Sequence, residues 1–127
     1  MVARHDDSDL SYRIIGCALE VHHHLGPGLL ESIYETCLCK EFNRAGLSFI
    51  RQQPLSVRYK GEDIVCEYRL DLVVEQSVVV ELKAVSQIHP IHEVQLLTYL
   101  RLSGIPLGLL INFNEVHLKD GIRRRPI

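Results

Sequence analysis

Three charged residues, Asp71, Glu81 and Lys83, interrupt two apolar runs of the chain. The runs, residues 70–74 and 78–82, are rich in β-branched side chains, and the short polar segment between them predicts a hairpin turn. If this hairpin is symmetric about its turn, Asp71 lies directly opposite Glu81. Lys83 then points to the same face, because side chains alternate along a strand. The spacing therefore predicts two carboxylates and an ammonium group in one place.

Such a pair of carboxylates could bind a metal ion. Side chains directly opposite each other lie about 5 Å apart at Cβ, and two carboxylates at about that distance repel by about 3 kcal/mol at an effective dielectric constant of about 20. A fold keeps such a pair only if a proton, a lysine or a cation lies between them. A divalent cation held by two carboxylates, with an ammonium group beside it, is an arrangement that can hydrolyse phosphodiesters.

The same residues also allow a simpler interpretation. Residues 80–84 could be an edge strand with a solvated charged face, in which Glu81 and Lys83 form a surface ion pair that contributes little. Val73 and Val79 share the expected face of the two carboxylates, so that face is not uniformly polar. Spacing alone leaves both interpretations open.

Length and composition predict one compact domain over residues 1–127, because a chain of this size has room for one core and not for two. No run approaches the roughly 20 apolar residues that span a bilayer, so we expect no membrane segment. The four cysteines, Cys17, Cys37, Cys39 and Cys66, form no CxxC pair. We interpret them as reduced, mostly buried thiols of a cytoplasmic protein.

The charge balance limits how the chain could bind nucleic acid. A net charge of −2 argues against strong, indiscriminate coating of nucleic acid. Residues 123–125 are three arginines that could form a local basic track with Lys119, or simply a solvated end. The three consecutive histidines at 22–24 cannot converge on one ion, because neighbours on a helix diverge by about 100°. We expect His22 to pack in the core or to support a site from behind its ligands, and not to be a ligand itself.

Periodicity and turn residues predict an α+β fold with the element order ααβββαββ. The expected helices are residues 9–24, a second from Pro27 or Gly28 to Ala45, and a third from Pro90 to about Ser103. The expected strands are residues 49–59, 64–74, 78–82, 107–113 and 122–126. Because Pro54 cannot donate a ladder hydrogen bond, we expect the first strand to be an outer strand or to carry a bulge.

Several polar residues fall on helix faces that should otherwise pack. In the second helix Glu31 lies inside the apolar arc and Glu35 at its margin, and a carboxylate there needs a partner or must stay protonated. Glu41 lies in the same arc, so periodicity does not single out Glu31, and the helix could equally be broad enough to be solvated at both edges. In the third helix Gln95 and Tyr99 share a stripe that could face a metal–phosphate site or could simply be solvated.

Separated motifs give the chain a resemblance to a known family. Residues 28–34, Gly-Leu-Leu-Glu-Ser-Ile-Tyr, match the signature of the GxxExxY family, a small-protein branch of the PD-(D/E)XK nuclease superfamily. The similarity continues through residues 68–71, 80–85, 92–100 and 108–113 and so covers most of the chain. Leu70 stands where the superfamily motif has its proline, which carries no chemistry.

This resemblance implies a restriction-endonuclease-like core, with a central mixed β-sheet flanked by helices. It also implies a Mg²⁺ site, in which Mn²⁺ should substitute. Asp71, Glu81 and the main-chain carbonyl of Leu82 fall on the metal-binding positions, and Glu31 resembles the acidic residue that many of these nucleases supply from a helix.

The remaining motif positions imply roles in hydrolysis. Lys83 falls on the catalytic lysine, and Gln95 and Tyr99 resemble the Gln-x-x-x-Tyr helix motif that positions the scissile phosphate. The resemblance thus implies a metal-dependent nuclease acting on nucleic acid, with DNA expected rather than RNA, and with a homodimer as one way to grip a duplex. The alternative is a catalytically silent module that uses the same fold to bind nucleic acid or a protein.

Overall fold

The computed structural model describes the main chain of residues 2–127 and the side chains of residues 9–127. The helices are α1 (Val2–Leu25), α2 (Glu31–Ala45), α3 (Pro90–Ser103) and the short 3₁₀-helix η1 (Leu118–Gly121). The strands are β1 (Phe49–Tyr59), β2 (Glu62–Val74), β3 (Val78–Lys83), β4 (Leu107–Asn112) and β5 (Ile122–Pro126). This order confirms the predicted α+β fold. No helix in the described part of the chain is both long and apolar enough to cross a membrane.

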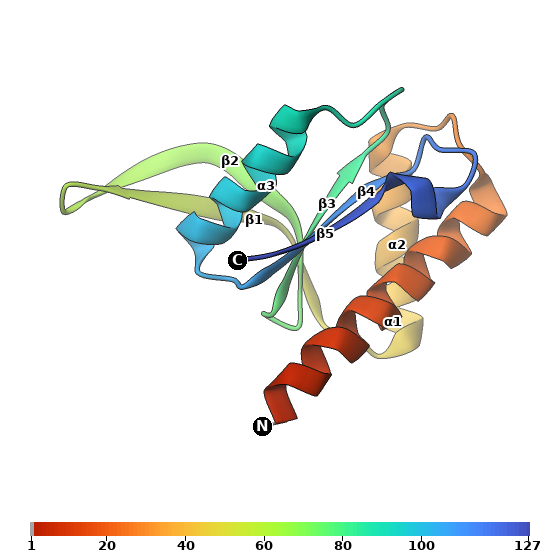
Figure 1. Cartoon of the computed structure of the whole chain (residues 1–127), viewed down its shortest axis with the longest axis horizontal. Coiled ribbons are helices and arrows are strands. Elements are labelled where there is room, and N and C mark those ends of the chain that lie inside the picture. The colour runs from red at the N-terminus through yellow and green to blue at the C-terminus, as the bar shows by residue number, and fades with distance from the viewer. Residues whose placement is uncertain (1) are drawn as a thin grey trace.

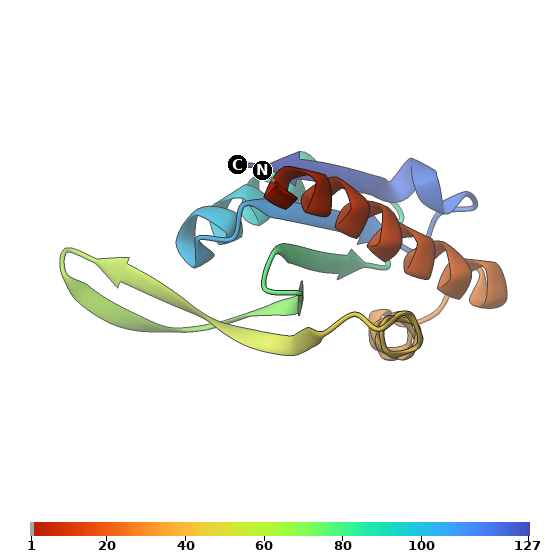
Figure 2. The same ribbon diagram turned by 90° about the horizontal axis from the view of Figure 1, so that it is seen from below.

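The five strands form one mixed sheet in the order β1-β2-β3-β4-β5. Neighbours pair antiparallel except β3 and β4, which are parallel and are joined by the crossover through α3. Helices α1 and α2 cover one face of the sheet and α3 covers the other (Figures 1 and 2). This layering leaves β3 in the centre of the sheet, so the edge-strand interpretation of this segment was wrong.

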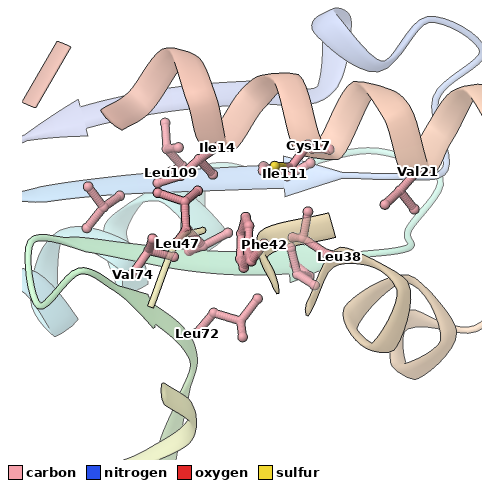
Figure 3. Packing of buried hydrophobic residues seen from close by; sticks show 14 of the residues in the cluster. Ile14, Cys17, Val21, Leu38, Phe42, Leu47, Leu72, Val74, Leu109 and Ile111 are labelled. Atoms are coloured by element: carbon pink, nitrogen blue, oxygen red, sulfur yellow. The ribbon is translucent and has the colours of Figure 1, made fainter. Parts of the chain in front are cut away.

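The hydrophobic core has two parts, one on each face of the sheet. In the larger part, Ile14 and Cys17 of α1 and Phe42 of α2 pack on Leu72 and Ile111 of the sheet (Figure 3). The smaller part lies under α3 and includes its two fully buried leucines at 96 and 100. Because both faces are covered, every residue of β4 is buried, which explains why the two central strands read as nearly continuous apolar runs.

Strands β1 and β2 form a long hairpin whose far end projects beyond the helices (Figures 1 and 2). Their register shifts between Pro54 and Ser56. β1 lies at the edge of the sheet, which confirms that the strand carrying Pro54 is an outer strand. At the register shift, Leu55 of β1 lies opposite residues 66–68, so the extra residues belong to β2. Most residues of the hairpin between 56 and 69 are exposed.

The second helix begins later than the sequence suggested. We expected Pro27 or Gly28 to open it, but Gly28 has a φ of 100°, which an α-helix does not accommodate, and the helix begins at Glu31. The hydroxyl of Tyr34 donates a hydrogen bond to the carbonyl of Gly26 at 2.6 Å and accepts one from the amide of Leu29 at 3.1 Å. The segment before α2 is therefore a loop fixed from inside the helix.

The C-terminal arginines lie in β5 and have partners. Arg123 and Arg125 both face the carboxylate of Glu93 on α3, and Arg124 donates to the hydroxyl of Ser11 on α1 at 3.3 Å. These contacts hold the last strand between two helices. The arginines are thus part of the fold and do not form a free basic track.

The cysteines are free thiols, as expected. Cys17 and Cys39 are buried, while Cys37 and Cys66 are partly exposed. Burial raises the pKa of the Cys17 and Cys39 thiols, so both stay protonated at neutral pH and pack as small apolar groups. His22 is partly buried, with its ring centroid 6.5 Å from that of Phe113 and its Nε2 2.7 Å from the carbonyl oxygen of Glu115.

Candidate active site

Asp71 and Glu81 meet where β2 and β3 separate. The backbone pairs of the hairpin run from Val74–Val78 to Leu72–Val80, which is the predicted register. Beyond the pair Leu72–Val80 the backbone of the two strands is no longer paired, and the two carboxylates accept hydrogen bonds from backbone amides instead. Glu81 Oε2 accepts a hydrogen bond from the amide of Asp71, and Asp71 Oδ2 accepts one from the amide of Leu82, both at 2.8 Å. The two acidic side chains therefore lie together in the opening between the strands, as the spacing predicted.

The acid pair is buried enough to hold a proton. Glu81 is 7% exposed and Asp71 is partly buried. Burial and the charge of Asp71 raise the pKa of Glu81 to about 8, and burial also raises the pKa of Asp71. At neutral pH and without a cation, the pair therefore retains a proton. The solvated-face interpretation is wrong for Glu81.

Lys83 ends β3 beside this pair. Its main-chain carbonyl accepts a hydrogen bond from the amide of Phe113 at 2.9 Å, on the β4 side. Because successive carbonyls of a strand point in opposite directions, the carbonyl of Leu82 faces β2, where Asp71 lies. The charge of Lys83 also opposes the rise in the pKa of Glu81.

Asn112 fixes the chain directly after Lys83. Its buried side chain donates to the carbonyl of Val85 at 2.9 Å and accepts from the amides of Val85 at 3.0 Å and Asn114 at 3.2 Å. The residue types and spacing of the sequence predicted no role for Asn112. A single polar residue at the end of the otherwise apolar run 107–111 was the available signal.

Helix α2 contributes two carboxylates, and their burial differs from expectation. Glu31, in the first turn, is exposed, although partial burial and the charge of Asp71 raise its pKa. Glu35, one turn later, is 6% exposed and accepts hydrogen bonds from Arg51 Nε at 3.1 Å and Gln52 Nε2 at 3.0 Å. The buried carboxylate of this helix is therefore Glu35, whereas Glu31 lies at a solvated edge of the helix, which was one of the two alternatives left open.

Gln52 links this helix to the acid pair. The side-chain amide of Gln52 donates a hydrogen bond to Glu35. A hydrogen bond from the same side chain favours the ionised form of Asp71 and so partly offsets the rise in the pKa of Asp71. The backbone of Gln52 has a φ of 51°, an unusual conformation within a strand. Sequence periodicity could not find Gln52 or Arg51, because their role depends on a helix that lies elsewhere in the chain.

Helix α3 lines the other side of the site. Burial and the charge of Glu81 raise the pKa of Tyr99 to about 12, so its phenol stays protonated and can donate a hydrogen bond. Burial and the charge of Lys83 lower the pKa of His92. Gln95 is partly buried and lies between these two residues on the same stripe of the helix. The charges of the acid pair thus act on Tyr99 and that of Lys83 on His92, whereas the roles of Gln95 and Tyr99 in a site stay a prediction.

The donor set suits a hard divalent cation. Arg51 balances the charge of Glu35. The site is then surrounded by three other carboxyl groups, those of Asp71, Glu81 and Glu31, and by one ammonium group, that of Lys83. Among residues 9–127, no group of three acidic, histidine or cysteine side chains is close enough together to hold a metal. Mg²⁺ usually takes one or two carboxylates and keeps several waters, which two buried carboxylates and a carbonyl oxygen can satisfy.

A family model for the PD-(D/E)XK nuclease superfamily matches residues 8–125. The match spans nearly the whole sequence, so this chain belongs to the PD-(D/E)XK nuclease superfamily, and its mixed sheet with flanking helices is a restriction-endonuclease-like fold. No curated protein and no solved structure matched the chain. Nucleases of this superfamily generally use divalent metals and act on nucleic acids, which agrees with the chemistry available to the acid pair.

Proposed function

We propose that this chain is a metal-dependent nuclease that hydrolyses phosphodiester bonds, and that it belongs to the GxxExxY branch of its superfamily. The observation that carries the proposal is the burial of Glu81 next to Asp71, which raises the pKa of Glu81 to about 8. Such an arrangement is unfavourable for folding alone, since burying a carboxylate beside another costs free energy that a bound cation would offset.

The proposed ion is Mg²⁺, with Mn²⁺ able to replace it. Asp71, Glu81 and the carbonyl of Leu82 would hold it. Glu31 does not lie close enough to the pair to complete a group of three carboxylate ligands, so it would contribute through a water molecule and not directly. When bound, a divalent cation acidifies water and offsets the negative charge that develops on the phosphate during hydrolysis. This assignment is supported by the oxygen-only donor set and by the excess of negative charge around it.

Residues outside the ion's ligands would position the reacting groups. Lys83 would orient the attacking water or take up its proton, from a backbone that is held by Phe113. Tyr99 stays protonated because its pKa is about 12, so its hydroxyl would donate a hydrogen bond to a phosphate oxygen. Gln95, one turn earlier on α3, would bind the same phosphate without adding charge.

A cleavage assay tests this function. The substrates are single-stranded, duplex and branched DNA and the corresponding RNAs, with Mg²⁺ or Mn²⁺. We expect hydrolysis by the wild type and by Lys119→Ala, a matched change of an exposed lysine on η1, and none by Lys83→Ala. Binding without hydrolysis of any substrate would instead support the silent module. The proposal includes DNA as the preferred substrate, a cytoplasmic location and a homodimer.

A further inference from the structure

A pair of tyrosines lies beside the acid pair. Tyr68 is on β2, three residues before Asp71, and its ring centroid is 5.8 Å from that of Tyr99 on α3, with the ring planes tilted by 46°. Tyr99 is partly buried, whereas Tyr68 is 57% exposed. The inner ring therefore supports an outer ring that remains open to solvent next to the candidate active site.

The charges near Tyr68 give little attraction for a phosphate backbone. Residues 55–69 of the hairpin contain three basic and three acidic side chains, so their charges cancel. Arg58 is paired with Asp63 at 2.9 Å, and Arg69 donates to the carbonyl of Gln52 at 3.3 Å. Binding by release of counterions requires unopposed basic groups. A ligand at this surface must gain its binding free energy in another way.

We propose that Tyr68 stacks on an unpaired base next to the scissile phosphate, which makes single-stranded DNA the substrate. Every base has a flat face that can stack on an aromatic ring, and such stacking does not depend on charge. The bases of an intact duplex are already stacked on each other and cannot reach Tyr68 unless they are unpaired. This inference rests on the proposed function, since it places the base beside the phosphate that the acid pair would hold.

Binding of a fluorescent oligonucleotide tests the role of Tyr68. The probe is single-stranded DNA with 2-aminopurine at each position in turn, and the protein carries Lys83→Ala so that the probe is not cut. We expect quenching of one 2-aminopurine, about tenfold weaker binding and loss of the quenching in Tyr68→Ala, and retention of both in Tyr68→Phe. Tyr59→Ala, at the far end of the same hairpin and similarly exposed at 60%, should bind like its parent.

The contrary outcomes are equally specific. No binding of the single strand, an equal loss in Tyr59→Ala, or an equal loss for duplex DNA with Tyr68→Ala would overturn the role of Tyr68. The proposed function is judged separately by cleavage. A wild type that binds single strands through Tyr68 without cutting them would keep the stacking on Tyr68 but would overturn single-stranded DNA as the substrate, together with the proposed function. Cleavage with unchanged binding in Tyr68→Ala would overturn this inference alone.

Discussion

Replacing Glu81 with glutamine should stabilise the metal-free protein at alkaline pH. Glu81 is buried, and its pKa is raised from 4.5 to about 8. The folded state therefore binds a proton more tightly than the unfolded chain does. The resulting stabilisation is complete below about pH 4.5 and is lost as the pH rises through about 8. Glutamine has no such titration, and its amide oxygen can still accept the hydrogen bond from Asp71.

The size of the effect follows from the pKa shift. A carboxyl whose pKa rises from 4.5 to about 8 on folding loses about 5 kcal/mol of stabilisation across that range. Asp71 shares the same protons with Glu81, so part of the shift belongs to the pair and not to one residue. We therefore expect the wild type to lose about 2–4 kcal/mol between pH 4.5 and pH 8 relative to Glu81→Gln.

Urea unfolding between pH 4.5 and pH 9 in the presence of a chelator measures this difference. Glu67→Gln, at an exposed position of β2, is the matched control and should follow the wild type. With Mg²⁺ in place of the chelator, the wild type should regain the stability that it loses at high pH, whereas Mg²⁺ should not stabilise Glu81→Gln. Parallel pH profiles for the wild type and Glu81→Gln would refute the reasoning, because they would mean that Glu81 titrates alike in the folded and unfolded chain.

Three further predictions concern the ion and the residues that shape the site. Mg²⁺ affinity, measured by calorimetry, should rise with pH up to about 8 because Glu81 must lose its proton to bind; a flat profile would contradict this. Tyr34→Phe should lower the free energy of unfolding by about 1–3 kcal/mol, because it removes two hydrogen bonds to the loop before α2, whereas Tyr12→Phe, on an exposed ring, should change it by less than about 0.5 kcal/mol. Asn112→Ala should lower the free energy of unfolding by about 2 kcal/mol or more and should lower the cleavage rate, because it leaves the amide and carbonyl of Val85 without their partner. An unchanged free energy of unfolding would show that the segment after β3 does not depend on Asn112.

The local parts of the site could be predicted from the sequence. A short turn between two β-branched runs fixes the register of a hairpin, and that register alone places Asp71 opposite Glu81. Pro54 likewise predicted an outer strand, because proline has no backbone N–H and cannot complete the hydrogen bonds of a central strand. These inferences succeeded because each depends on neighbours in the chain.

The parts that depend on distant partners could not be predicted. The wheel of α2 placed Glu31 inside the apolar arc, but the buried carboxylate is Glu35, which Arg51 and Gln52 of β1 compensate. The start of α2 was also missed, because a proline between two glycines resembles a helix start. Periodicity does not show that Tyr34 holds that segment as a loop.

Neighbouring strands bring Asp71 and Glu81 together, and we propose that the pair captures a divalent cation. Thermal unfolding with increasing Mg²⁺ or Mn²⁺ is the sharpest test, comparing the wild type with Asp71→Asn and with Asp120→Asn at an exposed position. We expect a metal-dependent rise in Tm for the wild type and Asp120→Asn that Asp71→Asn loses. An equal response from all three proteins would show that Asp71 holds no cation.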